Sequence, residues 1–424
     1  MKIAVIGAGI TGLVSCKYCK EAGFDVVVFE KYYTIGGTWV YTKDSKVNDL
    51  SHQTSMYKNL ITNSPIEVMG FRDFEFPSIC DKSYVSWKEV VEFLHDYAEN
   101  FALMDFIRFG HIVTKIEPQN DKWRVDVQNL DGCESFCEIF DAIFVCNGHF
   151  STPNMPSIEG IEYFQGKTLH SKEYDNPEMF QDQRVLIIGA GPSGIDLTFD
   201  VSKTAKQIAL SHHSKILKDI FPANVHQLPD VTHIASDGSV NFLNGNSEKF
   251  DAIIFCTGYN YNFPFIGNEC GLKMDNNHIT PLYKHIMHIE HPTLFFIGMT
   301  NVTIFTHLIE LQIQFSLKIL LKRIELPSKH EMYQELNHEI EDRIGKGYSG
   351  RRMHQLWPDY MRNYIDDLVR IGALNGIKPV LLDIYDESRA LSTAHPKETW
   401  YKLLHSVAMQ SVLHRPIFQR TPIC

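Results

Sequence analysis

Two short apolar runs of similar design stand at the start and near the middle of the chain. Residues 2–6 read KIAVI and residues 184–188 read RVLII, and glycines follow each run directly. A stretch with helical character comes next, to about residue 22 in the first case and about residue 201 in the second. Apolar runs of this length beside helical stretches predict buried strands of parallel sheets.

The same order of elements then repeats in both parts of the chain. A second strand follows each helix, FDVVVFE at residues 24–30 and QIALS at 207–211. Hairpin-like stretches at 122–140 and 231–250 precede two further buried strands, which end in Gly148 and Gly258. The sequence therefore predicts an α/β fold with two doubly wound Rossmann-like dinucleotide-binding domains, with helices on both faces of each sheet.

The second set of elements lies within the first, which predicts that a smaller nucleotide domain is inserted in a larger one. We expect the larger domain to comprise residues 1–160 and 283–326, and the inserted domain residues 161–282. A mostly helical C-terminal region should follow at 327–424, where HEMYQELNHEIEDRI is amphipathic.

The first glycine-rich turn has the full spacing of a dinucleotide-binding fingerprint, Gly7-x-Gly9-x-x-Gly12. Gly7 permits the tight turn, Gly9 lets a pyrophosphate approach the backbone, and Gly12 allows close packing of helix and strand. The start of the helix, with Ile10 and Thr11, supplies N–H donors and a positive dipole. Glu30 ends the next strand, where an acid accepts hydrogen bonds from ribose hydroxyls.

The N-terminal stretch MKIAVIGAGITGLVSC also resembles a secretory signal peptide, with a lysine, an apolar run and small residues. Cleavage near Ser15 would destroy the fingerprint, so we reject this interpretation.

A second fingerprint consists of Gly189, Gly191, Pro192, Ser193 and Gly194. Its following strand ends not in an acid but in a polar run that begins with Ser211 and contains His213 and Lys215. A carboxylate there would repel a ribose 2′-phosphate, whereas hydroxyl and nitrogen donors can bind it, so NADP is favoured over NAD. A merely solvated loop is the alternative. Two fingerprints imply two dinucleotides, most economically FAD at the first and a nicotinamide reductant at the second.

Composition excludes several classes of function. The chain has 424 residues with a formal net charge of −11, which argues against nucleic-acid partners and docking on anionic membranes. Apolar stretches are too short for a membrane helix. Nine cysteines show no zinc-site spacing, so we expect no metal and a reducing, cytoplasmic environment.

One segment gives a specific family resemblance. In FQGKTLHSKEY, the residues Phe164, Gly166, His170 and Tyr174 fit the FxGxxxHxxx(Y/F) signature. With the two fingerprints, the chain resembles the flavin-containing monooxygenases, which are class B flavoprotein monooxygenases that use FAD and NADPH. The resemblance extends from residue 1 to about 325 and is looser beyond. It is nearest to compact bacterial, yeast and insect N-oxygenases, without the membrane anchor of vertebrate members.

The resemblance also implies site residues. EKYYTIGGTW corresponds to the segment after the flavin-binding acid, and LITNSP to the segment with the family's active-site asparagine, here Asn63. Matching positions near the cofactors are Glu30, Lys31, Gly37, Thr38, Trp39, Thr62, Asn63, Thr257 and Gln312. We expect His170 to be a structural hydrogen-bonding residue rather than a catalyst. His213 stands where the family commonly has an arginine, which leaves the preference for NADPH over NADH open.

The resemblance further implies that one atom of molecular oxygen is inserted into a tertiary amine or a sulfide through a flavin 4a-hydroperoxide. Plant alkaloids and other xenobiotics are candidate substrates. Alternatives are a Baeyer–Villiger or N-hydroxylating monooxygenase with the same cofactors, and a non-catalytic nucleotide sensor. A disulfide reductase is excluded because Cys16 and Cys19 lie within the first predicted helix. The assembly state is open, with a homo-oligomer as one option.

Overall fold

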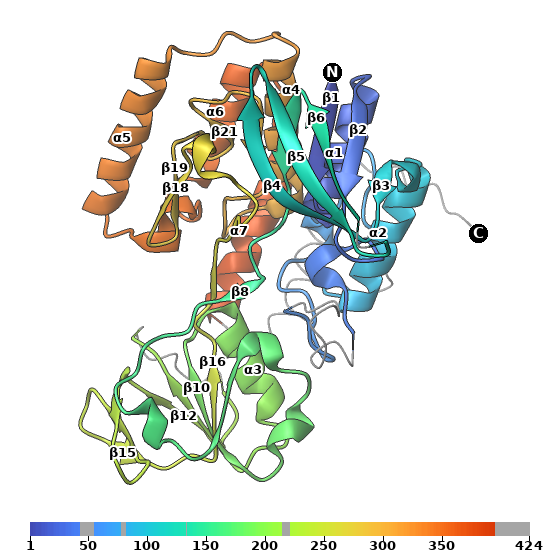
Figure 1. The fold of residues 1–424 in the computed structure, drawn as a ribbon. Coiled ribbons are helices and arrows are strands. Elements are labelled where there is room, and N and C mark those ends of the chain that lie inside the picture. Colours follow the sequence, from blue (N-terminus) through green and yellow to red (C-terminus); the bar gives the residue numbers. More distant parts are fainter. Residues whose placement is uncertain (43–54, 78–81, 133, 214–220, 395–424) are drawn as a thin grey trace.

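The computed structural model describes residues 1–42, 55–77, 82–132, 134–213 and 221–394. Two sheets organise this part of the chain, and Figure 1 shows them as two units joined by thin connections. The larger unit contains a seven-stranded sheet and the smaller unit a five-stranded sheet.

The seven strands of the larger sheet lie in the order β20-β21-β22-β7-β1-β2-β3. Five of them, from β22 to β3, are parallel, while β20 and β21 are antiparallel to their neighbours. In chain order the strands are β1 (Lys2–Ile6), β2 (Asp25–Phe29), β3 (Ile107–Arg108), β7 (Ala142–Val145), β20 (Leu282–Tyr283), β21 (Met287–His288) and β22 (Leu294–Phe296).

Alternate residues of the central strand β1 face two different layers, as the period of a strand requires. Ile3 and Val5 pack with the helices α1 (Ile10–Glu21), α2 (Trp87–Asn100) and α4 (Phe305–Leu320). Ala4 and Ile6 pack instead against an antiparallel meander of β4 (His111–Gln119), β5 (Lys122–Asn129) and β6 (Glu134–Phe140).

The smaller sheet is entirely parallel, in the order β12-β11-β10-β16-β9. Its strands are β9 (Lys167–His170), β10 (Arg184–Ile188), β11 (Gln207–Ser211), β12 (Val225–Leu228) and β16 (Ala252–Phe255). Val185 and Ile187 face α3 (Pro192–Val201), whereas Leu186 faces the second meander. That meander consists of β13 (Val231–Ile234), β14 (Val240–Phe242) and β15 (Ser247–Glu248).

The predicted fold class is confirmed, with one correction. We expected helices on both faces of each sheet, but a three-stranded meander covers one face of each. An antiparallel meander with one apolar face buries a sheet as completely as a helix layer does, so apolar patterning alone did not distinguish the two.

Two short crossings connect the units and pair with each other. The outgoing strand β8 (Thr152–Pro153) and the returning strand β17 (Tyr259–Asn260) form an antiparallel ladder. The smaller unit is therefore inserted in the larger one, as predicted. After the return, Tyr261, Phe263 and Phe265 already pack in the core of the larger unit with Ala4, ahead of the boundary we expected at residue 282.

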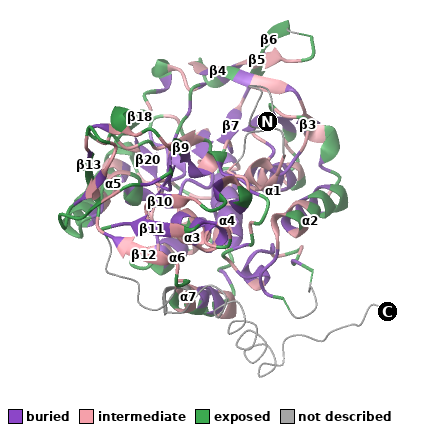
Figure 2. Ribbon diagram, turned by 90° about the horizontal axis from the view of Figure 1, so that it is seen from below, coloured by how far each residue is buried: buried purple, intermediate pink, exposed green. Residues whose placement is uncertain are grey.

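The C-terminal helices pack on the larger unit instead of trailing away from it. They are α5 (Lys329–Gly345), α6 (Met361–Gly372) and α7 (Pro379–Ala394), and a hairpin of β18 (Lys273–Asp275) and β19 (His278–Thr280) lies beside α5 (Figure 1). Figure 2 shows α4 as largely buried, while the outer strand β6 is mostly exposed.

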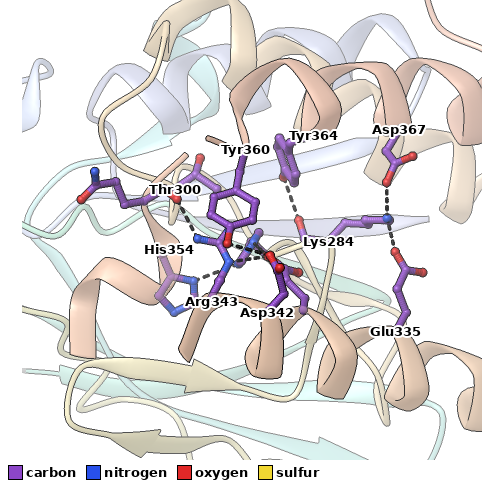
Figure 3. Close-up of polar contacts among 12 residues, drawn as sticks. Lys284, Thr300, Glu335, Asp342, Arg343, His354, Tyr360, Tyr364 and Asp367 are labelled. Carbon is purple, nitrogen blue, oxygen red and sulfur yellow. Dashed lines mark hydrogen bonds and ion pairs between the residues drawn. The ribbon is translucent and has the colours of Figure 1, made fainter. Parts of the chain in front are cut away.

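A polar network around the buried side chain of Lys284 fastens these helices (Figure 3). Lys284 forms ion pairs with Glu335 of α5 and Asp367 of α6, and its carbonyl oxygen accepts the Tyr364 hydroxyl proton at 2.7 Å. Since Lys284 lies in the turn between β20 and β21, the network ties both helices to the edge of the larger sheet.

Candidate dinucleotide-binding and active sites

The first fingerprint forms a backbone cradle that only glycine fits. Gly7 has φ +102°, and a Cβ atom there would lie 2.8 Å from the carbonyl oxygen of Cys146. A Cβ atom at Gly12 would overlap the carbonyl oxygen of Gly7, and one at Gly37 would lie 2.9 Å from the Cα atom of Gly9. The close approach of Gly9 to Gly37 thus brings two predicted cofactor residues together.

The start of α1 offers donors to an anion. Gly9 is the N-cap residue of α1, and no side chain caps this end of the helix. Ile10, the first residue of α1, is half-buried. The first backbone N–H groups of the helix therefore remain available to a ligand in the cradle. Unpaired N–H groups and the helix dipole both favour a phosphate at this position.

Glu30 closes the cradle on the side of β2. Its Oε2 accepts the N–H of Ala8 at 2.7 Å and its Oε1 accepts the N–H of Tyr32 at 2.9 Å. Burial raises the pKa of Glu30, and the backbone donors oppose this by stabilising the carboxylate. A carboxylate oxygen has more than one acceptor position, so both oxygens can still accept ribose hydroxyls.

The other predicted residues of this part lie around the cradle. Thr11 is buried, and its Oγ1 lies 3.3 Å from the position of a Cβ atom at Gly298, just after β22. Thr38 Oγ1 lies 3.0 Å from Ser55 Oγ, and Trp39 packs against the helical side of the core. Lys31 is exposed. The carboxyl ends of β1 and β22 therefore meet at one place, where α1 and α4 also begin.

The loop with Asn63 is held by its neighbours on both sides. Thr62 is buried and exchanges two hydrogen bonds with Val85: its N–H donates at 2.8 Å, and its hydroxyl accepts at 3.2 Å. Asn63 is exposed, and none of the described residues hydrogen bonds its side-chain amide. Further along, Thr306 at the start of α4 donates to the carbonyl oxygen of Val68 at 2.9 Å. The contact of Asn63 with a cofactor stays a prediction.

Gln312 has a different environment from the one expected of a flavin-contacting residue. It is fully buried in α4; its Oε1 accepts the N–H of Gly298 at 2.9 Å, and its Nε2 donates to Tyr364 Oη at 2.9 Å and to Thr300 Oγ1 at 3.3 Å. Both amide hydrogens are thus used within the protein. Gln312 positions the segment after β22, and its direct contact with a cofactor stays a prediction.

The second fingerprint repeats the first cradle. Gly189 has φ +104°, and a Cβ atom there would lie 2.5 Å from the carbonyl oxygen of Cys256. A Cβ atom at Gly194 would overlap the carbonyl oxygen of Gly189, whereas Gly191 has open space around it. Pro192 begins α3 and Ser193 is half-buried, and no side chain caps this helix start. A second diphosphate fits here by the same physical argument.

The end of β11 is less complementary to a phosphate than the sequence suggested. The Ser211 hydroxyl is buried and donates to the carbonyl oxygen of Pro229 at 2.8 Å. His213 is exposed, but its Nδ1 lies 3.7 Å from Oδ1 of Asp230. A 2′-phosphate at this point would therefore meet an acid as well as the imidazole. Lys215 lies outside the described residues.

The signature segment before the second fingerprint has a structural role. His170 Nδ1 accepts the N–H of Lys172 at 3.1 Å, so the ring proton lies on Nε2, which donates to the carbonyl oxygen of Gly258 at 3.0 Å. The Tyr174 hydroxyl donates to Asp200 of α3 at 2.7 Å. Thr257 donates from Oγ1 to the carbonyl oxygen of Asn154 at 2.6 Å, which joins the two crossings.

A cavity of about 460 Å³ beside the crossings was missed by sequence reasoning. Arg351, in the 3-10 turn η8 (Gly350–His354), lines it together with residues of the crossings and of the β18–β19 turn. The only signal was the adjacent arginine pair Arg351-Arg352, which belongs to no motif.

Comparisons with known proteins agree with this geometry. The model of the family described as flavin-binding monooxygenase-like matches residues 1–225 and 214–394. The chain belongs to this family. Its members use FAD and NADPH and are oxidoreductases. The structure has two glycine cradles with the geometry of dinucleotide-binding turns.

Individual relatives cover most of the chain. The flavin-containing monooxygenase FMO GS-OX5 of Arabidopsis thaliana is 36% identical over 400 residues, 89% of this chain and 86% of that protein. The senecionine N-oxygenase of Tyria jacobaeae is 34% identical over 352 residues, 80% of this chain and 75% of that protein. The solved S-allyl-L-cysteine S-oxygenase of Allium sativum superposes with a TM-score of 0.86 at 30% identity, covering 98% of this flavin-binding monooxygenase and 99% of that chain.

No helix among the described residues is long and apolar enough to span a bilayer. Within the same residues, no group of three or more His, Cys, Asp or Glu side chains could hold a metal ion.

Proposed function

We propose that this flavin-binding monooxygenase uses FAD and NADPH to insert one oxygen atom of molecular oxygen into a soft nucleophile, a tertiary amine or a sulfide. The main support is the pair of equivalent glycine cradles, around Gly12 and Gly194, in units joined by adjacent crossings. The relatives that the chain resembles include both an N-oxygenase and an S-oxygenase.

Each cradle has an assigned ligand in this proposal. The N–H groups at the start of α1 hold the diphosphate of FAD, and Glu30 accepts hydrogen bonds from its ribose. The start of α3 holds the diphosphate of NADPH. When bound, reduced FAD supplies the activation of molecular oxygen, and the protein supplies binding, orientation and exclusion of water.

Asn63 is the residue we assign to the reacting centre. Its amide can both donate and accept hydrogen bonds, and it is exposed on a loop whose backbone is fixed by Thr62 and Val85. Thr306 connects the end of this loop to α4, so Asn63 moves as part of the larger unit. A rigid support of this kind is what a positioning amide needs.

The histidines near the crossings are poor general acids, which fits a reaction whose hard steps belong to the cofactor. Burial lowers the pKa of His149 to about 4, so its ring is neutral at pH 7. Burial also lowers the pKa of His170, and both of its ring nitrogens already have partners.

The test is product formation by the FAD-loaded protein with NADPH and ¹⁸O₂. Senecionine supplies a tertiary amine and S-allyl-L-cysteine a sulfide, with their oxygenated products as non-substrate controls. The proposal predicts that one ¹⁸O atom enters one of these compounds, or another member of a panel of amines and sulfides, with consumption of NADPH. NADPH consumption that yields only hydrogen peroxide with an entire panel of amines and sulfides would contradict it, and bound flavin without NADPH oxidation would indicate a sensor.

A further inference from the structure

The cavity beside the crossings has polar walls with one cationic side chain. It is lined by Asn154, Thr257, Asn260, Tyr261, Met274, Asn276, Asn277 and Arg351. Arg351 is the only ionised side chain among them, in a protein whose formal net charge is −11. Its volume, about 460 Å³, is sufficient for a small ligand or for part of a dinucleotide.

The guanidinium of Arg351 lacks a counter-ion within the described part of the chain, where no carboxylate pairs with it and no acceptor hydrogen bonds it. Arg351 is exposed, and its guanidinium lies beside Gly258, where a Cβ atom would overlap it. Gly258 has φ +83°, and His170 holds its carbonyl oxygen. The backbone of the returning crossing therefore leaves room for the guanidinium.

Asn260 and Asn276 provide two neutral donors beside this cation, since their amide nitrogens make no hydrogen bond to any described residue. The other two asparagines of the lining, Asn154 and Asn277, already donate from their amide nitrogens to the carbonyl oxygens of Thr257 and Tyr259. A guanidinium and free amide donors around one space provide the chemistry that binds an oxoanion.

The cavity adjoins the second fingerprint. Thr257 lines the cavity, and its backbone nitrogen lies 3.7 Å from the position of a Cβ atom at Gly189. Arg351 itself belongs to the larger unit, where its carbonyl oxygen accepts the Asn301 amide at 3.3 Å. A ligand in the cavity would therefore contact both units at the carboxyl end of β16, where open α/β sheets bind their ligands.

We propose that the Arg351 cavity is a binding subsite for an oxoanion, either a phosphate of the nicotinamide dinucleotide or the carboxylate of an amino-acid-like sulfide substrate. The inference rests on the proposed function, since that function implies both ligands. The shared chemistry is a charge-assisted hydrogen bond between the guanidinium and anionic oxygen atoms, supported by Asn260 and Asn276.

The experiment compares Arg351→Gln and Arg351→Lys with the neighbouring Arg352→Gln as control, all loaded with FAD. Arg352 lies over the ring of Tyr348 at 4.6 Å and does not line the cavity. In the first arm, the Kd of NADP⁺ is measured by titration of the flavin absorbance. In the second arm, KM is measured for S-methyl-L-cysteine and for ethyl methyl sulfide, which lacks the carboxylate.

Loss of a charge-assisted hydrogen bond should weaken binding about tenfold or more in Arg351→Gln. A weaker Kd for NADP⁺ assigns the subsite to the dinucleotide. A raised KM for S-methyl-L-cysteine, with ethyl methyl sulfide unchanged, assigns it to the substrate carboxylate. Arg351→Lys should lose less affinity in the same arm, and Arg352→Gln should match the wild type.

Two outcomes separate the inference from the proposed function. If the wild type binds NADP⁺ and forms product, but Arg351→Gln changes Kd and KM by less than twofold, the inference alone is overturned. A wild type that does neither overturns the proposed function.

Discussion

The Nδ1 atoms of His285 and His354 lie 3.0 Å apart, and the partners of the two rings fix where the protons are. His354 Nε2 accepts the N–H of Ile279 at 3.0 Å, so its proton is on Nδ1, which donates to His285. The proton of His285 is then on Nε2, which donates to Glu339 at 2.9 Å. Glu339 also pairs with Arg343 at 2.7 Å (Figure 3 labels Arg343 and His354). This chain connects the β18–β19 hairpin to α5.

Acid should destabilise the protein through this cluster. Burial, together with Coulomb repulsion from His285 and His278, keeps the pKa of His354 well below its ordinary value of 6.5, and the pKa of His278 is lowered to about 4. Below about pH 6.5 these histidines bind protons in the unfolded chain but not in the folded chain. The free energy of unfolding is therefore largest above about pH 6.5 and falls below it by about 1.4 kcal/mol per pH unit for each histidine.

The measurement is urea denaturation between pH 7 and pH 5. His354→Gln keeps a donor and an acceptor but cannot titrate. The decrease in the free energy of unfolding between pH 7 and pH 5 should therefore be smaller in this variant, by the contribution of one histidine. His330→Gln, an exposed histidine of α5, is the matched control and should retain the full loss. An unchanged pH slope in His354→Gln would show that this ring does not contribute.

Gly12→Ala and Gly194→Ala should separate the two nucleotide sites. Each Cβ atom would overlap a backbone carbonyl oxygen of the same turn. That oxygen can move away only if the backbone of the turn changes conformation. We expect Gly12→Ala to lose bound FAD, and Gly194→Ala to keep the flavin spectrum while binding NADP⁺ at least about tenfold more weakly. Gly345→Ala, with no atom near its Cβ position, is the control. Equal loss of FAD in both variants would refute the assignment of one dinucleotide to each cradle.

Asn63→Ala should uncouple NADPH oxidation from oxygenation. The loop backbone is held by Thr62 and Val85, so the variant should fold and retain FAD. Without the amide, oxygenated product per NADPH should fall about tenfold or more, with hydrogen peroxide formed instead. Asn129→Ala, in the meander strand β5, is a control outside the site. Undiminished product formation by Asn63→Ala would remove this residue from the reacting centre.

His213→Arg should increase the preference for NADPH over NADH. A permanent cation would replace an exposed imidazole that Asp230 competes for. The ratio of kcat/KM for the two coenzymes should rise about tenfold. Asp230→Asn should shift the ratio in the same direction, because it removes a charge that repels the 2′-phosphate. If neither variant moves the ratio, the 2′-phosphate is bound elsewhere.

Gln312→Leu should lower stability more than it changes the bound flavin. The substitution leaves the N–H of Gly298 and the hydroxyl of Thr300 without their buried partner, at a cost of about 2–4 kcal/mol. Tyr364→Phe removes one partner of the same amide and should cost about 1–2 kcal/mol. Urea denaturation measures both, and the absorbance of bound FAD should stay the same. A shifted flavin spectrum in Gln312→Leu alone would instead indicate contact with the cofactor.

The sequence predicted the features whose causes are local. Both cradles follow from glycine spacing next to apolar runs, because the steric conflict between Gly12 and Gly7 arises within six residues. The insertion followed from the repeated order of elements. By contrast, Ile3 and Ala4 are both apolar, and nothing in their identity tells a helix layer from a meander layer.

The features that were missed depend on contacts between distant segments. Arg351 meets Gly258 across more than ninety residues, and neither the arginine pair nor the glycine alone indicates the other. Similarly, the sequence predicts that Ser211 can bind a phosphate, but its hydroxyl donates to the carbonyl oxygen of Pro229. Tertiary hydrogen bonding of this kind has no period or motif in the sequence.

The ladder of Thr152–Pro153 with Tyr259–Asn260 has a consequence for protein engineering. The chain leaves the larger unit and re-enters it at neighbouring points, so the intervening residues form a cassette with adjacent ends. Domains with adjacent termini tolerate exchange between hosts. The inserted unit could therefore be replaced by another nucleotide-binding domain at these two positions, without lengthening a connection or cutting a strand of the seven-stranded sheet.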